Sequence, residues 1–256
     1  FVYRHSHHIA FTLVAIKKYK SMIYYILVLL QFLPCKFINE INPSAHLIIQ
    51  SDTLSLDEQL NVFNSLGYNL NEGITKKTIL KNMAGNYLPE TNLEQEFKNQ
   101  QFDLLYIILG GYSVDPTTHY TNHCILYNLG FNDLGSEFTS FIQRMSVITN
   151  GELNYSDIEL KLENGFQWLK FKVNGISKSW KLMAVGRSDD SFFNRFVELT
   201  TEFKTKGKYT YFDNGGTDFI IDYATEDEQK QFIAKTKLKR EWLGEGNHFS
   251  KYDPSK

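Results

Sequence analysis

The chain has 256 residues, of which 42% are hydrophobic and 15% aromatic. That is enough apolar material for one large or two small packed domains. Five prolines and the lack of any repeat or low-complexity run exclude a disordered chain or a repeat array. Two cysteines, Cys35 and Cys124, are too few for a disulfide framework, which fits a reducing compartment.

The net charge of −2 hides an uneven distribution. Residues 1–21 contain four bases and no acid, so the remaining residues have 23 bases against 29 acids and a net charge of −6. Because phosphate binding needs clustered Lys and Arg, this acidic body disfavours nucleic acid as a partner. Within the body, 186–228 is acidic and 229–256 is basic, the ordinary pattern of solvated helix faces.

Residues 1–46 form an N-terminal segment of uncertain role. A basic stretch at 17–20 precedes the apolar run 22–33, as in a signal peptide. The run is short for a transmembrane helix, and no small-x-small cleavage site follows it. We expect untranslated or poorly ordered sequence ahead of a cytoplasmic domain, with export or membrane anchoring through 22–33 as the alternative.

A mostly helical lobe is predicted over 47–112. Ser55 and Glu58 form a capping box that opens a first helix, and apolar spacing predicts a second helix over 76–84. Asn92 could cap a third helix running through Phe97. The apolar stretch 102–109 fits either a buried helix or a buried strand, and the polar helical run before it favours helix.

The rest of the chain, 113–256, is predicted as an α+β domain organised on a three-strand meander at 157–185. Aliphatic and charged residues alternate there, and Asn164-Gly165 and Asn174-Gly175 suit type I′ turns. A loop over 112–121, a strand over 123–129 and a helix around 138–145 precede it. A helix over 192–203 and a hairpin at 209–223 follow it. Thr225 and Glu228 then form a second capping box, which opens a helix over 225–239. The sequence thus predicts an α+β fold with an antiparallel sheet built on a meander and a later hairpin, packed with helices.

One short stretch contains residue types that carry chemistry. Asp115, His119, His123 and Cys124 lie within ten residues, and the two histidines have the spacing of a helical zinc pair. Pro116 argues against a helix, and no further ligand or orienting group is evident. A small hydrolase or metal-dependent enzyme using these residues is therefore the alternative, and we expect no metal and no cofactor.

Four residues are candidate partner-binding residues. Strand parity places Phe166 and Trp168 on the mixed-charge face of the meander, either as an exposed patch or as core beneath a covering helix. Asp189 and Asp190 could be an acidic pair, but they also precede a helix, where carboxylates cap free N–H groups.

Several segments carry a family resemblance: SLDEQLNVFNSLGYNLNEGI, FDLLYIILGG, SWKL with SDDSFFNRF, and GGTDFIIDYATEDEQKQFI with TKLKREWL. Over roughly 47–243 the chain resembles uncharacterised cytosolic proteins of Bacteroidota-type bacteria, some of which resemble toxin-neutralising immunity proteins. The resemblance implies no catalytic residues. We expect a non-enzymatic bacterial protein that binds another protein, with a toxin as one candidate partner. Nothing in the sequence indicates the oligomeric state.

Overall fold

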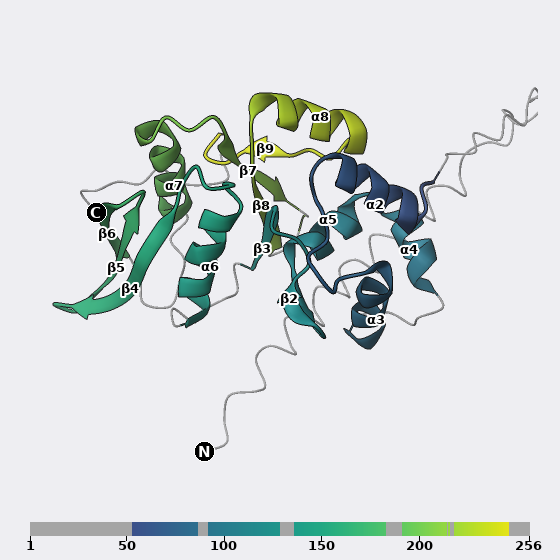
Figure 1. Ribbon diagram of the computed structural model, residues 1–256, viewed down its shortest axis with the longest axis horizontal. Coiled ribbons are helices and arrows are strands. Elements are labelled where there is room, and N and C mark those ends of the chain that lie inside the picture. The colour runs from purple at the N-terminus through teal and green to yellow at the C-terminus, as the bar shows by residue number, and fades with distance from the viewer. Residues whose placement is uncertain are drawn as a thin grey trace, which may run out of the picture. The chain divides into compact units, whose positions relative to one another are not determined.

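The computed structural model describes residues 53–86, 92–128, 136–182, 191–213, 215 and 218–245. Residues 51–256 form one compact unit. The predicted α+β fold is confirmed, because helices pack against antiparallel sheets (Figure 1).

The described residues contain seven helices. They are α2 (Leu56–Ser65), α3 (Lys76–Asn86), α4 (Leu93–Asn99), α5 (Asp103–Gly110), α6 (Ser136–Val147), α7 (Ser191–Glu202) and α8 (Glu226–Thr236). None of them has the length and apolar content needed to cross a bilayer. The apolar run 22–33 lies outside the described residues.

Strands in the described residues form three antiparallel groups. They are β1 (Tyr112–Val114), β2 (Thr117–His119), β3 (Cys124–Asn128), β4 (Tyr155–Glu163), β5 (Phe166–Val173), β6 (Ile176–Leu182), β7 (Lys208–Asp213), β8 (Asp218–Ala224) and β9 (Glu241–Trp242). A four-stranded sheet has the order β3-β8-β7-β9, the meander forms a three-stranded sheet β4-β5-β6, and β1 pairs with β2.

The four-stranded sheet separates two hydrophobic cores. Successive residues of β8 alternate between them: Ile220 belongs to the first core, and Phe219 and Ile221 belong to the second. This is the two-residue period of a strand buried on both faces.

The first core lies between the four-stranded sheet and a layer of helices that includes α2, α5 and α8. Phe63, Tyr106 and Phe232 from these helices are buried against one another, with ring centroids 5.0–6.2 Å apart. Helix α5 ends directly on the sheet, because a Cβ at Gly110 would meet the backbone nitrogen of Leu126 at 2.7 Å. The boundary predicted at 112/113 stays a prediction. What the structure shows is that helices before it share this core with strands after it.

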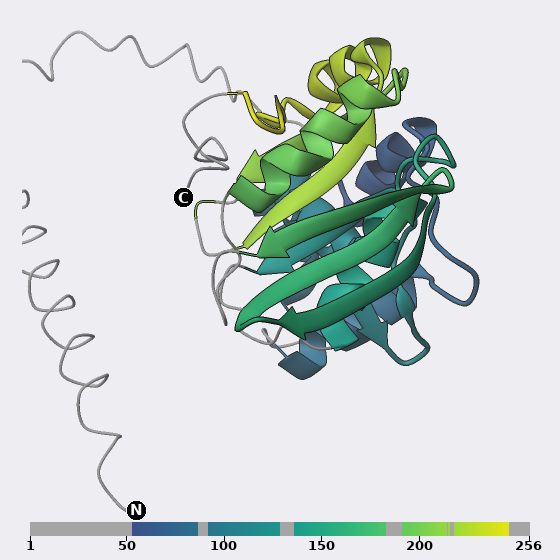
Figure 2. The ribbon, with the colours of Figure 1, turned by 90° about the vertical axis from the view of Figure 1, so that its left-hand side faces the viewer.

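The second core lies between the four-stranded sheet and the meander, and helices α6 and α7 pack between these two sheets (Figures 1 and 2). Both helices supply buried aromatic or aliphatic side chains, among them Ile142 and Phe196. The meander closes this core with the inner face of β5, where Leu169, Phe171 and Val173 are buried. The meander is therefore the outermost layer of the described residues on that side.

The local signals in the sequence explain the element boundaries. Both predicted capping boxes, Ser55 with Glu58 and Thr225 with Glu228, are formed, so α2 and α8 begin where expected. Each Asn-Gly turn of the meander has both residues at positive φ, between 49° and 82°, as a type I′ turn requires. The helix alternative for 102–109 is confirmed by α5.

Some local predictions were wrong. The predicted loop 112–121 contains the β1–β2 hairpin, whose three-residue strands are too short to show a period. Asn92 makes no side-chain cap bond to α4. Helix α8 ends at Thr236 rather than Lys239, because Lys237 adopts the left-handed conformation and terminates it. Trp242 consequently lies in β9, against β7.

Candidate functional site

Two groups of polar side chains among the described residues are candidate sites, and they contrast because one is buried and the other exposed. The first is a network beneath the four-stranded sheet, on the side of the first core. The second is the outer face of the meander. A third group, the Asp115–Cys124 stretch, was singled out from the sequence.

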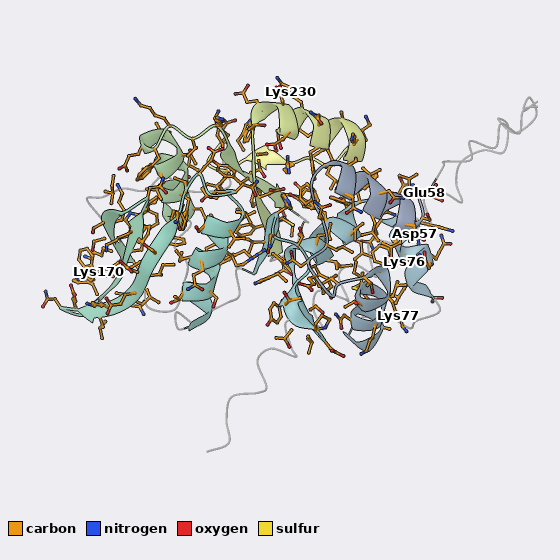
Figure 3. All side chains as sticks on the ribbon, viewed as in Figure 1. Asp57, Glu58, Lys76, Lys77, Lys170 and Lys230 are labelled. Atoms are coloured by element: carbon orange, nitrogen blue, oxygen red, sulfur yellow. The ribbon has the colours of Figure 1, made fainter. Side chains whose placement is uncertain are left out.

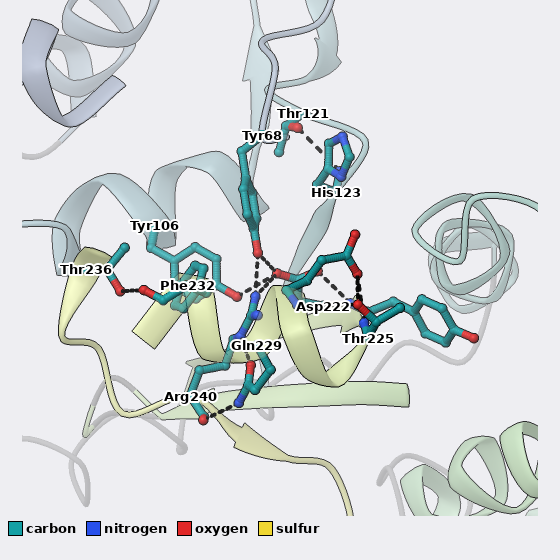
Figure 4. A network of polar contacts seen from close by, with 12 residues as sticks. Tyr68, Tyr106, Thr121, His123, Asp222, Thr225, Gln229, Phe232, Thr236 and Arg240 are labelled. Carbon is teal, nitrogen blue, oxygen red and sulfur yellow. Dashed lines mark hydrogen bonds and ion pairs between the residues drawn. The ribbon is translucent and has the colours of Figure 1, made fainter. Parts of the chain in front are cut away.

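The buried network is centred on the Asp222 carboxylate of β8 (Figure 4). Arg240 Nη1 lies 2.6 Å from Asp222 Oδ2, and the two side chains are 1% and 3% exposed. The same oxygen accepts hydrogen bonds from the hydroxyls of Tyr68 and Tyr106, the latter at 3.0 Å. Side chains from three other segments of the chain, around positions 68, 106 and 240, therefore meet at this one carboxylate.

Arg240 is held from several sides. Its Nε donates to Gln229 Oε1 at 2.5 Å, and Gln229 Nε2 donates back to the Arg240 carbonyl at 2.5 Å. Its guanidinium carbon lies 3.7 Å from the ring centroid of Phe232, a cation–π contact. The charged and polar groups thus satisfy one another, as buried polar groups must.

Burial also fixes the protonation of the network's tyrosines. Desolvation, followed by the charge of Asp222, raises the pKa of Tyr68 and of Tyr106 well above 10.0. Both hydroxyls therefore stay protonated and act as donors. With no exposed member, the network is suited to hold elements together, not to reach a substrate.

The second place is the outer face of the meander, which no described helix or strand covers (Figure 2). We call the set Lys161, Phe166, Trp168, Lys170, Lys172 and Lys181 the aromatic–lysine face. Strand register places Trp168 in its middle, opposite Lys161 of β4 and Lys181 of β6. Trp168 is partly exposed and belongs to neither hydrophobic core of the described residues.

Three of the four lysines on this face are neutralised by neighbouring acids. Nζ–carboxylate distances are 3.0 Å for Lys161–Glu159, 2.5 Å for Lys170–Glu163 and 2.7 Å for Lys172–Asp157. The hydrogen bonds that Lys161 donates to Glu159 and Lys172 donates to Asp157 raise the pKa of the two lysines.

Lys181 differs from the other three lysines. Its Nζ lies 3.4 Å from the ring centroid of Phe166, and it makes no ion pair with any described carboxylate. Phe166 itself is 47% exposed. Two aromatic side chains and a cation without a counter-charge among the described residues therefore lie side by side on the outer face of this sheet.

The residues of the enzyme alternative are placed as follows. Asp115 is exposed and pairs with Lys81 at 2.8 Å. His119 packs edge-on against Tyr112, and the His123 ring lies 5.5 Å from that of Tyr68. Among the described residues, no three His, Cys, Asp or Glu side chains lie close enough together to hold a metal ion.

The protonation of His119 and of Cys124 does not favour their use in acid–base or nucleophilic chemistry. Burial, then the nearby charge of Arg144, lowers the pKa of His119 to about 4, so it is a weak base. Burial raises the pKa of the Cys124 thiol well above 9.0, so the reactive thiolate does not form at neutral pH.

Of the four residues predicted to bind a partner, the structure brings Phe166 and Trp168 together on one strand face. Asp189 and Asp190 lie outside the described residues. Sequence reasoning missed Lys181, because its relation to Phe166 depends on how β6 lies beside β5. It also missed Asp222 and Arg240, which are 18 residues apart and read separately as surface charges.

Comparison of the chain with family models, with curated proteins and with solved structures found no match. The functional argument therefore depends on the geometry of the chain itself.

Proposed function

We propose that this protein acts by binding another protein through the aromatic–lysine face, without carrying out a chemical reaction. The observation that supports this most is the position of Trp168 and Phe166 on a sheet face against which no described helix or strand packs. Trp is among the residue types most enriched at interface positions that contribute the most binding free energy. Such positions are commonly surrounded by contacts that contribute little energy themselves but exclude water.

The charge pattern favours a protein over a nucleic acid as the partner. Glu159, Glu163 and Asp157 neutralise three of the four lysines, so the face has no run of free cations to follow a phosphate backbone. Paired charges around an aromatic centre instead form the polar rim that protein interfaces have.

A toxin is the partner class that we propose, because the sequence resembles bacterial proteins that include immunity-like members. An immunity protein needs only tight binding, and rigid strands hold the binding residues more accurately than loops do. The two type I′ turns and the regular β5–β6 register supply that rigidity.

The test is affinity purification of the tagged full chain from its native bacterium, with the Trp168→Ala variant in parallel. We expect a stoichiometric protein partner with the wild-type chain and an affinity roughly thirtyfold lower with the variant, since a central interface Trp contributes about 2 kcal/mol or more. No stoichiometric partner, or a partner bound equally by both chains, would contradict the proposal.

If the partner is a toxin, its expression should arrest growth, and co-expression of this protein should restore it. Trp168→Ala should restore growth less well at equal protein level. The matched control is Lys77→Ala on α3, because Lys77 and Lys170 of the face lie at opposite ends of the drawn body (Figure 3).

A further inference from the structure

The tip of the β4–β5 hairpin exposes apolar side chains on both of its faces. Leu162, the second-last residue of β4, is 71% exposed, and Phe166, the first residue of β5, is 47% exposed. In Figure 1 the arrowhead of β4 extends beyond α6 and α7, so the tip stands clear of the second core.

Strand parity determines where each side chain points. Leu162 pairs with Gln167 and has the parity of Leu160 and Leu169, the inward set. Phe166 pairs with Glu163 and has the parity of Trp168, the outward set. Since alternate residues of a strand point to opposite faces, Leu162 and Phe166 lie on opposite sides of the hairpin.

The tip is rigid. Its turn is Asn164-Gly165 with φ of 54° and 79°, and Lys170 reaches along the hairpin to Glu163 at 2.5 Å. An exposed Leu and an exposed Phe on a rigid tip form a wedge that is ordered before any partner arrives. Pre-ordering reduces the entropy lost on binding.

We infer that the β4–β5 tip inserts into a concave cleft of the partner protein, with apolar walls on both sides and a carboxylate facing Lys181. A flat partner surface could cover Phe166 or Leu162 but not both. The carboxylate follows from Lys181, the one lysine of the face without a described acid, which lies beside the exposed Phe166 ring.

This inference rests on the proposed function and deepens it by specifying the shape and charge of the partner's site. Desolvating a lysine without a counter-charge is costly, so a partner that covers Lys181 must offer an acid. Lys181 would also be attracted to an acidic cleft as the two proteins approach, which should speed association at low salt.

The test uses the full chain with a photo-reactive amino acid at position 162, at position 166 or at the control position 114. Val114 is matched to Leu162, because it is an exposed strand residue of similar exposure, at 69%. We expect positions 162 and 166 to cross-link to the same polypeptide in the native bacterium and position 114 not to. Cross-linking from only one tip position would mean a flat contact and would overturn the wedge.

A second arm tests the charge. Carbodiimide activates a carboxyl group, and a lysine amine attacks it to form an amide with release of the urea. We expect an amide between Lys181 and an Asp or Glu of the captured partner, and none from Lys77. Lys181→Glu should slow association at low salt at least about tenfold, with Lys77→Glu unchanged. An unaltered rate, or no amide from Lys181, would overturn the acidic cleft.

Leu162→Ala separates loss of binding from loss of folding, because it removes a mostly exposed side chain. We expect it to leave the melting temperature unchanged and to weaken the affinity for the partner roughly tenfold or more. Recovery of no partner by affinity purification would refute the proposed function itself. Recovery of a partner that neither tip position contacts would refute only the wedge.

Discussion

The buried network around Asp222 and the aromatic–lysine face are built from the same kinds of side chain: a cation, carboxylates and aromatic rings. In the network, the side chains of Arg240 and Asp222 are 1% and 3% exposed. The polar side chains of Tyr68, Tyr106 and Gln229 complete their hydrogen bonding. On the face, ion pairs of similar length are about half exposed. Water therefore decides their roles: breaking a buried pair is costly, whereas an exposed pair adds little stability and is available for recognition.

The largest expected effect concerns the buried ion pair. Arg240→Ala should destabilise the protein by about 3–5 kcal/mol, because it leaves the Asp222 carboxylate buried without a counter-charge. The measurement is urea unfolding followed by far-UV circular dichroism. Lys230→Ala, which removes an exposed pair with Asp227, is the control and should change little. Equal losses of unfolding free energy in the two variants would contradict the predicted difference between buried and exposed ion pairs.

The two sides of strand β5 give the next comparison. Phe171→Ala, at a residue 3% exposed in the second core, should cost about 3–5 kcal/mol through the cavity it leaves. Trp168→Ala, on the opposite face of the same strand, should lower the melting temperature far less and act mainly on partner binding. Thermal unfolding of the two variants side by side measures this. A loss with Trp168→Ala as severe as with Phe171→Ala would show that Trp168 serves packing.

Alkaline pH should weaken the buried tyrosines' contribution. The folded-state pKa of Tyr68, Tyr106 and Tyr209 is raised by burial above the ordinary 10.0, so the folded chain keeps protons that the unfolded chain releases. Stability is thus fully present below pH 10 and falls as pH rises above it, by about 1.4 kcal/mol per pH unit for each tyrosine. Tyrosinate absorbance at 295 nm should include a cooperative step that coincides with loss of circular dichroism. A smooth titration with the fold intact would contradict this.

The smallest effect is expected on the aromatic–lysine face itself. Lys170→Ala removes a partly exposed pair with Glu163 and should change stability by at most about 1 kcal/mol, with a difference that shrinks as salt is added. Urea unfolding at low and high ionic strength measures this. A large, salt-independent loss would mean that Lys170 packs as core.

Prediction from sequence succeeded where a signal is local. The capping boxes at Ser55 and Thr225 and the turns at Asn164-Gly165 and Asn174-Gly175 depend on bonds and dihedral angles within four residues, so the residues alone specify them. The alternation along β5 likewise identified Phe171 as inward and Trp168 as outward. The three-residue strands β1 and β2 escaped notice because they contain less than two periods of any pattern.

The candidate site was only half accessible from the sequence. Phe166 and Trp168 were identified from strand parity, but whether a helix covers their face depends on how α6 and α7 pack, on the opposite side of the meander. The position of Lys181 beside Phe166, without an ion pair to a described carboxylate, likewise emerged only from the tertiary structure.

The sequence by itself therefore determined most of the helices, the turns of the meander and the inward and outward sides of its strands, because short-range sterics and hydrogen bonds govern them. Only the tertiary structure decided which charges are buried. Tyr68, Tyr106 and Arg240 reach Asp222 across separations of 154, 116 and 18 residues, and no local pattern records such a meeting. The same ion pair of arginine and aspartate would be a marginal surface contact elsewhere. Here the packed helices exclude water from it, so removing either partner leaves an uncompensated buried charge.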